Sequence, residues 1–430
     1  MKKRLLSALC AVMLLICAVP MASAQTGDAA RRADALTVLH LLSEDPGRDL
    51  TAPATRAQAA VLLVRLAGGE KKPDTDGWFA GFRDVPDWAR TAANYANRRG
   101  WISGVSNVQF DPNGHLNADA WCAMLLRMLG YSDKTGDFEI SDAAAFAWRI
   151  GLTGRQLIGI LSVGDLAESI YDALDFCYKG TETTVLSRLM DLGVCTASAA
   201  NALGLLNKDY TARQLADRYL SAAFQLSLYE TEEQVHDEVS SADASGFFIS
   251  ADGLAVTNYH SIEDSIKATA TLLNGETYEV ERVLYYDTGI DIAVIKVSQT
   301  NQSRRTTSAF NHLDLVGTAD IRPGDPVYAI GNPLGLGLAI SSGIIGSTAH
   351  ELDRYALPCI VNSADISRGS SGGALMNAHG QVIGVTSGAY TYGNNMYLAV
   401  PVDPVMAADL TVSGWTLKEV KAFEAAKDKD

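Results

Sequence analysis

The 430-residue sequence has little cysteine, an excess of negative over positive charge, and no apolar run long enough to cross a membrane. Six cysteines are far below the density of a disulfide-stabilised scaffold. Lys and Arg number 35 against 50 for Asp and Glu, and the resulting formal charge of −15 disfavours nucleic acid as a partner. Neither a Cys-x-x-Cys pair nor a His pair at ligand spacing is present, so we expect no metal and no cofactor.

The composition is otherwise that of a globular chain, with 47% apolar and 20% charged residues. At roughly 150 residues per domain, the length predicts two to three domains. The chain can therefore bury sizeable cores, and neither a single small module nor a disordered chain fits it.

The N-terminus has the three parts of a secretory signal peptide. Lys2, Lys3 and Arg4 are basic, residues 5–19 are nearly all apolar, and Ala22-Ser23-Ala24 is a small-residue cleavage site. The apolar run of about 15 residues is shorter than the roughly 20 that a membrane span needs. We predict a secreted mature chain without a transmembrane segment.

Four cysteines remain after the signal peptide. They are Cys122, Cys177, Cys195 and Cys359. A Cys177–Cys195 disulfide and buried free thiols are both compatible with an exported protein.

The texture of the mature sequence changes near its middle. From about residue 29 to 223, apolar residues recur at intervals of three and four, which indicates helices. From about 244 to 405, short alternating β-branched runs are separated by Gly, Asn and Asp, which is typical of a β-barrel or sandwich. We predict a signal peptide at 1–24, a helical region at 25–225, an acidic linker at 226–243, a β-rich domain at 244–408 and a C-terminal tail at 409–430.

The helical region contains a repeat. Residues 60–68 return 62 residues later as 122–130, and each predicted helix ends at a glycine, Gly68 or Gly130, that is suited to a left-handed C-cap. Between them lies Phe82-Arg83-Asp84-Val85-Pro86-Asp87-Trp88. These residues resemble the S-layer homology module, which in its family binds cell-wall polysaccharide. One unit is nearly complete at 79–131, part of another lies at 33–68, and a worn third is expected at 138–175.

The wall-contacting motif of that family is Thr-Arg-Ala-Glu, and Thr55-Arg56-Ala57-Gln58 keeps it almost intact. The resemblance makes Thr55 and Arg56 candidates for binding an anionic wall polymer. The other two units have Asn117-Ala118-Asp119-Ala120 and Ser162-Val163-Gly164-Asp165, so they have lost the arginine. Thr55 also fits a helix N-cap, and the helical region also fits a plain spacer.

The β-rich region contains a serine in a glycine-lined turn, Gly369-Ser370-Ser371-Gly372-Gly373, just before an apolar strand. Glycines permit backbone conformations that aim N–H groups inward, as an oxyanion hole requires. Because a hydroxyl is a poor nucleophile, Ser371 would need a histidine as base. The apolar runs on both sides argue against the alternative of a flexible linker.

Of the seven histidines, one stands at the end of a predicted strand beside turn residues, and this is His260. Asp291 opens the apolar strand Ile292-Ala293-Val294-Ile295 and is placed to orient an imidazole. Its alternative is a turn residue at the start of a strand, as we expect for Asp287. The chain order His260, Asp291, Ser371 is that of chymotrypsin-like enzymes.

Five blocks in order carry a specific resemblance to the Do-like, high-temperature-requirement (HtrA) serine peptidases. They are Ser245-Gly246-Phe247-Phe248-Ile249-Ser250, Thr257-Asn258-Tyr259-His260, Asp291-Ile292-Ala293-Val294, Gly331-Asn332-Pro333-Leu334-Gly335 and the serine turn. The resemblance covers about 165 residues and implies an all-β double barrel of chymotrypsin type behind the all-α repeats. It implies a serine endopeptidase that acts on protein or peptide substrates.

By this resemblance, His260 is the general base, Asp291 orients it, and Ser371 is the nucleophile. The backbone N–H groups of Gly369 and Ser371 would form the oxyanion hole. Asp365, six residues before Ser371, has the spacing at which trypsin-like enzymes hold a carboxylate in the S1 pocket.

Two departures from the family matter. About 25 residues follow Val405, too few for the PDZ domain of many relatives, so we expect none. Barrel strands before Ser245 are poorly marked, which leaves open an inert peptidase fold on a cell-surface binding protein whose helical modules do the work.

Overall fold

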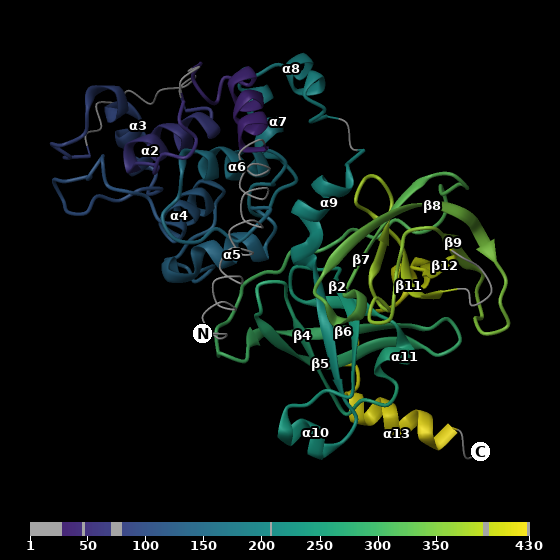
Figure 1. Cartoon of the computed structure of the whole chain (residues 1–430). Helices are drawn as coiled ribbons and strands as arrows, with labels where there is room; N and C mark the ends of the chain where they lie inside the picture. Colours follow the sequence, from purple (N-terminus) through teal and green to yellow (C-terminus); the bar gives the residue numbers. More distant parts are fainter. Residues whose placement is uncertain (1–27, 45–47, 70–79, 207–208, 390–394, 428–430) are drawn as a thin grey trace, which may run out of the picture. The chain divides into compact units, whose positions relative to one another are not determined.

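The computed structural model describes residues 28–44, 48–69, 80–206, 209–389 and 395–427. The chain divides into two compact units (Figure 1). The helical unit comprises Met1–Ala147 and Gln156–Leu206, and the barrel unit comprises Trp148–Arg155 and Asn207–Asp430. The predicted signal peptide at 1–24 lies outside the described residues. No described helix has the length and apolarity that a membrane crossing needs.

The helical unit consists of short helices, most of which begin at a Ser, Thr or Asn cap. They are α2 (Arg56–Leu66), α3 (Asp87–Arg98), α4 (Ala118–Met128), η1 (Ile140–Asp142), α5 (Ala143–Arg149, whose last two residues belong to the barrel unit), α6 (Val163–Ala173), α7 (Val185–Asp191) and α8 (Ala197–Ala202). Residues 28–38 are helical as well. Gly68 and Gly130 follow α2 and α4 with φ of 68° and 97°, as the repeat predicts.

The segments that lead into α2, α4 and α6 meet in a closed ring of backbone hydrogen bonds. The N–H of Ala54 donates to Leu161 O (2.8 Å), that of Leu161 to Leu116 O (2.9 Å), and that of Leu116 to Ala54 O (3.0 Å). The three predicted repeat positions, 55, 117 and 162, are therefore equivalent N-caps around a pseudo-threefold axis.

The barrel unit contains two closed barrels of six strands each (Figure 1). The first has the order β1-β2-β3-β6-β5-β4, and the second β10-β11-β12-β9-β8-β7. The strands are β1 (Ala223–Tyr229), β2 (Ala242–Phe248), β3 (Leu254–Thr257), β4 (Lys267–Thr271), β5 (Thr277–Asp287), β6 (Ile292–Asn301), β7 (Pro326–Gly331), β8 (Ala339–His350), β9 (Cys359–Asn362), β10 (Ala374–Met376), β11 (Val382–Ala389) and β12 (Tyr397–Pro401). The helices are α9 (Ala212–Tyr219), η2 (Leu220–Ala222), α10 (Glu232–Asp237), α11 (Tyr259–Ile262), η3 (Pro333–Gly335), α12 (Asp403–Ala407) and α13 (Leu417–Lys427).

The prediction of a linker at 226–243 is wrong, because β1 occupies residues 223–229 and pairs with both β2 and β4 to close the first barrel. Phe224, Leu226 and Leu228 alternate with more exposed residues and are buried in its core. This period-2 pattern is short and is followed by a run of acidic residues, which obscured it. The barrel that carries His260 is therefore complete.

The prediction of a C-terminal tail at 409–430 is also wrong for the described residues. The backbone of Trp415 bonds both ways with Val283 of β5 (2.7 and 2.9 Å). Leu417 and Val420 of α13 are buried in the core of the first barrel. Two apolar residues three apart on one helix face were too weak a signal to predict this packing.

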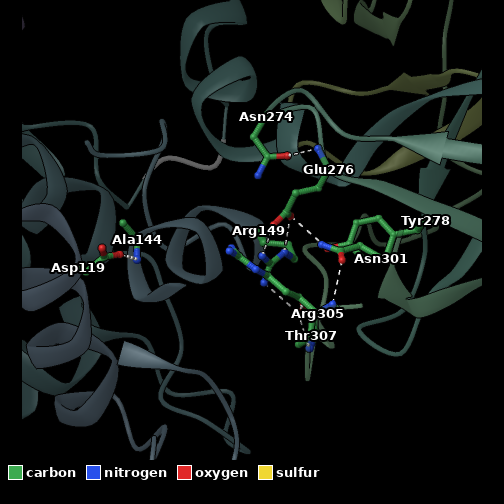
Figure 2. A network of polar contacts seen from close by, with 10 residues as sticks. Asp119, Ala144, Arg149, Asn274, Glu276, Tyr278, Asn301, Arg305 and Thr307 are labelled. Atoms are coloured by element: carbon green, nitrogen blue, oxygen red, sulfur yellow. Dashed lines mark hydrogen bonds and ion pairs between the residues drawn. The ribbon is translucent and has the colours of Figure 1, made fainter. Parts of the chain in front are cut away.

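Two segments of the predicted helical region, Trp148–Arg155 and the stretch from Asn207 to residue 225, belong instead to the barrel unit. Trp148 is 3% exposed in the core of the first barrel. The guanidinium of Arg149 donates to both carboxylate oxygens of Glu276 (2.7 and 2.8 Å) and to Thr307 Oγ1 (3.2 Å), as Figure 2 shows.

The Glu276 carboxylate also accepts a hydrogen bond from the Tyr278 hydroxyl at 3.1 Å. Burial alone would raise the pKa of Glu276, but the hydrogen bonds and charge of Arg149 outweigh burial and lower it. Arg149 and Glu276 thus form a buried, fully hydrogen-bonded ion pair at the first barrel.

The structure contains no Cys177–Cys195 disulfide, because Cys195 is a buried free thiol. Cys122 and Cys359 are buried free thiols as well. Burial raises the pKa of the Cys359 thiol to about 11, and the nearby Asp291 adds to this rise.

Candidate active site

His260 lies on α11, one turn beyond the end of β3. Its Nδ1 is 2.8 and 2.9 Å from the two carboxylate oxygens of Asp291, and its backbone N–H donates to Asp291 Oδ1 at 2.9 Å. Since an ionised carboxylate only accepts, this contact assigns the proton of a neutral imidazole to Nδ1. Nε2 is then the acceptor, on the ring edge away from Asp291. The side chain is 32% exposed.

Asp291 immediately precedes β6 and is 5% exposed. Its φ of 68° lies in the left-handed region, which is costly for a residue other than glycine. The conformation is held by Asn258 Nδ2, which donates to Asp291 O (2.8 Å), and by Asp287 O, which accepts from the Asp291 N–H (2.9 Å). Strained backbone of this kind clusters at functional sites. Asp287 instead caps the turn, with its Oδ1 accepting from the N–H groups of Gly289 and Ile290.

Ser371 lies in the loop between β9 and β10, which packs tightly against its surroundings. A Cβ on Gly372 would lie 2.2 Å from Ser245 O, and one on Gly373 would lie 2.2 Å from Ile330 O. Only glycine fits at these two positions, which explains the Gly-Gly that follows the serine.

The Ser371 hydroxyl donates to Ser387 O at 3.2 Å. In the part of the chain that the structure describes, no hydrogen bond joins Ser371 Oγ to the His260 ring. Catalytic hydrogen bonds are often absent or long without substrate and form in the enzyme–substrate complex.

Ser387 on β11 is a polar residue that the sequence did not reveal as part of the site. Its hydroxyl donates to Asp291 Oδ2 (2.7 Å) and, having one proton, accepts from the Tyr355 hydroxyl (2.9 Å). Ser387 therefore contacts Asp291 through its side chain and Ser371 through its carbonyl. Its one sequence signal is that it follows the apolar run 382–385 as a small polar residue on the same strand.

The loop before the nucleophile carries the two backbone N–H groups that are predicted to form the oxyanion hole. Gly369 has a φ of 94°. Within the described residues, the N–H groups of Gly369 and Ser371 donate to no protein atom. Two backbone donors beside a serine hydroxyl are the arrangement that stabilises a tetrahedral oxyanion.

Asp365 does not lie at the base of a buried pocket. Its side chain is exposed, and the hydroxyl of Tyr397 donates to its carboxylate. That hydrogen bond is the main reason why the pKa of Tyr397 is raised. An S1 role for Asp365 remains a prediction, and it would require a substrate cation to compete with Tyr397.

Thr55 and Arg56 lie in the helical unit and are both engaged in its own structure. Thr55 caps α2, with a capping box to Gln58. Arg56 donates to Phe110 O (2.9 Å) and Ser103 O (2.7 Å), and its guanidinium lies over the Phe110 ring. Burial lowers the pKa of Arg56, partly offset by Asp111 and Asp84. The Arg56 guanidinium, which the motif predicts to bind a wall polymer, thus joins two repeats.

Two closed β-barrels, a His–Asp pair at the first and a glycine-flanked serine on the second define a chymotrypsin-like serine peptidase domain. Residues 244–385 match the family model of the trypsin-like peptidase domain.

Curated relatives place this domain more closely. Over 171 residues the chain is 37% identical to the mitochondrial serine protease HTRA2 of Bos taurus, covering 39% of this chain and 35% of that one. Over 177 residues it is 35% identical to a probable periplasmic serine endoprotease, DegP-like, of Halomonas elongata, covering 40% and 35%. It spans less than half the length of these relatives. The barrel unit carries a serine endopeptidase domain of the HtrA/Do type.

Among solved structures, the HtrA-type protease AlgW with tripeptide matches 46% of this chain and 62% of that chain, with 24% identity and a TM-score of 0.39.

Proposed function

We propose that the protein is a secreted serine endopeptidase that cleaves protein or peptide substrates with His260, Asp291 and Ser371. The observation that carries this proposal is the buried Asp291 carboxylate, which bonds to both the backbone N–H and Nδ1 of His260. The same carboxylate is linked through Ser387 to the strand that contacts Ser371. Such a pair leaves Nε2 available as the base that a serine hydroxyl needs.

In the proposed reaction, the Ser371 hydroxyl turns from Ser387 O to His260 Nε2. Oγ attacks the scissile carbonyl carbon as its proton passes to Nε2, and the oxyanion accepts from the N–H groups of Gly369 and Ser371. The C–N bond then breaks and Nε2–H protonates the leaving amine. Water, deprotonated by Nε2, attacks the acyl-enzyme ester, and the proton returns to Ser371 Oγ as the acid leaves.

A fluorophosphonate probe and a peptide library test this proposal. The purified mature chain should be labelled covalently and cleave members of the library, whereas Ser371→Ala should do neither. Cleavage after Lys or Arg that is lost in Asp365→Asn would support the S1 assignment. A folded wild-type chain that is neither labelled nor active would instead favour the inert binding protein.

A second proposed function, wall association, is supported by a cavity of about 330 Å³ in the helical unit. Its lining combines two guanidinium groups, Arg48 and Arg65, with the indole of Trp88 and also includes the Asp49 carboxylate. Both guanidinium groups donate a hydrogen bond to Ser43. Trp88 is 62% exposed, an unusual position for so large an apolar ring. An aromatic face beside guanidinium groups suits an anionic sugar polymer, because the ring can stack on a sugar while the arginines pair with its acidic substituent.

Pelleting with purified cell walls tests this second function. Trp88→Ala and Arg65→Ala should reduce the pelleted fraction. Arg83→Ala removes an exposed arginine that does not line the cavity and is the matched control. Equal pelleting of all four proteins, or no pelleting of the wild type, would remove wall association from the proposal.

A further inference from the structure

Ser245, on β2 of the first barrel, is fully buried. Its hydroxyl and backbone N–H form hydrogen bonds with the second barrel and the nucleophile loop. Its hydroxyl donates to Gly369 O (2.7 Å) and accepts from the Asn332 N–H (2.8 Å). Its backbone N–H donates to Ser371 O (2.8 Å). Its carbonyl accepts from Thr257 Oγ1 (2.8 Å), so all of its polar atoms are satisfied.

The two peptide planes that flank Gly369 are each anchored through their carbonyl. In the Arg368–Gly369 peptide, the carbonyl of Arg368 accepts from the Leu334 N–H at 2.7 Å. In the Gly369–Ser370 peptide, the carbonyl of Gly369 accepts from Ser245. Because the N–H and C=O of a trans peptide point in opposite directions, anchoring a carbonyl also aims the N–H across that plane. The Gly369 N–H is thus directed away from Leu334, and the Ser370 N–H is directed to Ser367 O (2.9 Å).

Close packing leaves this arrangement little freedom. A Cβ on Gly369 would lie 2.5 Å from Asn332 O, and a Cβ on Gly331 would lie 3.1 Å from Ser245 Oγ. A glycine with φ of 94° would otherwise exchange readily between conformations. Among the described residues, Ser245 provides the one side-chain hydrogen bond to the Gly369–Ser370 peptide.

We propose that Ser245 is a positioning residue for the oxyanion hole. The Gly369 N–H belongs to the Arg368–Gly369 peptide, which the Leu334 N–H holds. By fixing the adjoining Gly369–Ser370 peptide, Ser245 prevents Gly369 from rotating about its own φ and ψ, so that the Gly369 N–H keeps its direction when charge develops on the substrate carbonyl oxygen. This inference rests on the proposed peptidase function. It assigns Ser245 an effect on the transition state and none on the binding of the ground-state peptide.

The test compares Ser245→Ala with wild type and with Ser221→Ala. Ser221 is a buried serine of the same unit whose hydroxyl accepts from Asn311 Nδ2 (2.9 Å) outside the nucleophile loop, so it controls for general loss of a buried hydroxyl. Deleting an oxyanion donor outright costs about 10²- to 10³-fold in kcat. Misaiming one should lower kcat by about 10- to 100-fold and leave KM within about threefold of wild type, because only the transition state loses a bond.

A peptide boronic acid gives a second readout, because its tetrahedral adduct places an oxygen where the oxyanion forms. Ser245→Ala should bind it more weakly by the factor lost in kcat, whereas it should bind the cleaved product peptide as the wild type does. Ser221→Ala should keep wild-type kcat. An unchanged kcat in folded Ser245→Ala, or a loss that appears only in KM, would overturn the proposal.

If Ser245→Ala does not fold, Ser245→Cys retains most of the volume with a weaker donor and should lower kcat by about 3- to 10-fold. Wild-type kcat in that variant would also overturn the proposal. Labelling by a fluorophosphonate separates the two hypotheses. A labelled wild type with an unaffected Ser245→Ala removes only the positioning role, while an unlabelled wild type removes the peptidase function and this role with it.

Discussion

Both units of the chain bring three distant stretches of sequence to one point, but they differ in what remains available there. In the helical unit, the stretches around Ala54, Leu116 and Leu161 satisfy one another through a ring of backbone hydrogen bonds. In the barrel unit, the stretches around His260, Asp291 and Ser371 also meet, but some of their polar groups form no hydrogen bond within the described chain. Nε2 of His260 lies on the ring edge away from Asp291, and the described chain offers no acceptor to the N–H groups of Gly369 and Ser371.

The difference shows how to weigh a motif residue. Arg56 matches a binding motif, yet its guanidinium donates hydrogen bonds to the backbone carbonyls of Phe110 and Ser103. Ser371 matches a catalytic motif, and its hydroxyl makes one long hydrogen bond, which costs little to break. A motif residue whose polar groups are all bound inside the fold stabilises it, whereas one with spare groups is placed to act on a ligand.

The largest effect on activity is expected from removing the side chains of the candidate triad. Ser371→Ala or His260→Ala should each lower kcat by about 10⁶-fold, and the double variant should lose little more, because the two residues act as one unit. Asp291→Asn should cost about 10⁴-fold, since an amide leaves the imidazole in the wrong tautomer. Pre-steady-state cleavage of the best library peptide measures all four. Additive losses in the double variant would show that Ser371 and His260 do not cooperate.

The next effect concerns the stability of the barrel unit. Arg149→Met leaves the Glu276 carboxylate buried without its partner and should lower the free energy of unfolding by about 3–5 kcal/mol. The double variant Arg149→Met, Glu276→Gln removes the stranded charge and should recover much of the loss. Denaturant unfolding followed by tryptophan fluorescence measures both. A single variant as stable as the double variant would mean that the unpaired Glu276 carboxylate costs nothing, and a double variant as stable as the wild type would mean that the ion pair adds nothing.

This ion pair also predicts a pH dependence. The pKa of Glu276 is lowered in the folded chain from its ordinary value of 4.5. Its contribution to stability is therefore complete above pH 4.5 and is lost as the pH falls through the lower folded pKa. In Arg149→Met, burial without its partner raises the pKa of Glu276, so the gap between wild type and variant should be largest at high pH. It should start to shrink above pH 4.5, as the variant's carboxyl becomes protonated, and continue to shrink as the pH falls through the lowered pKa of the wild type. A gap that widens in acid would contradict the assignment.

Sequence reasoning found the candidate triad because each member stands in a recognisable local setting, a strand end, a strand start or a glycine turn. It missed Ser387 and Tyr355, which act through contacts between β11 and the loop after β8. Nothing local marks such contacts, because they exist only once the second barrel has closed.

The fold was predicted well where elements repeat or alternate over many residues, and poorly where a short segment joins a remote core. Trp148 and Leu417 pack in the first barrel from positions outside the predicted domain. Their burial follows from tertiary packing, and neither lies in a stretch whose periodicity reveals its partner.

A smaller effect is expected at Arg56. Arg56→Ala removes two hydrogen bonds to carbonyls and a contact with the Phe110 ring, so it should destabilise the helical unit by about 1–3 kcal/mol. Wall pelleting of the folded variant should equal that of the wild type, in contrast to Arg65→Ala. Thermal unfolding and pelleting of the same samples measure the two effects. Lost pelleting at full stability would return Arg56 to the role of a polymer ligand.

The smallest effect tests whether the three repeat positions are equivalent. Thr55, Asn117 and Ser162 each accept a hydrogen bond from the backbone N–H three residues on, so alanine at each should cost about 1 kcal/mol. Thr55 and Ser162 also belong to capping boxes, in which the backbone N–H of the cap donates to Gln58 or Asp165. That backbone bond survives the substitution, but the hydroxyl's own hydrogen bond to Gln58 or Asp165 is lost, so Thr55→Ala and Ser162→Ala should exceed Asn117→Ala by no more than about 1 kcal/mol. A much larger loss at one position would show that the ring depends on that repeat more than on the others, and that the pseudo-threefold arrangement does not extend to its energetics.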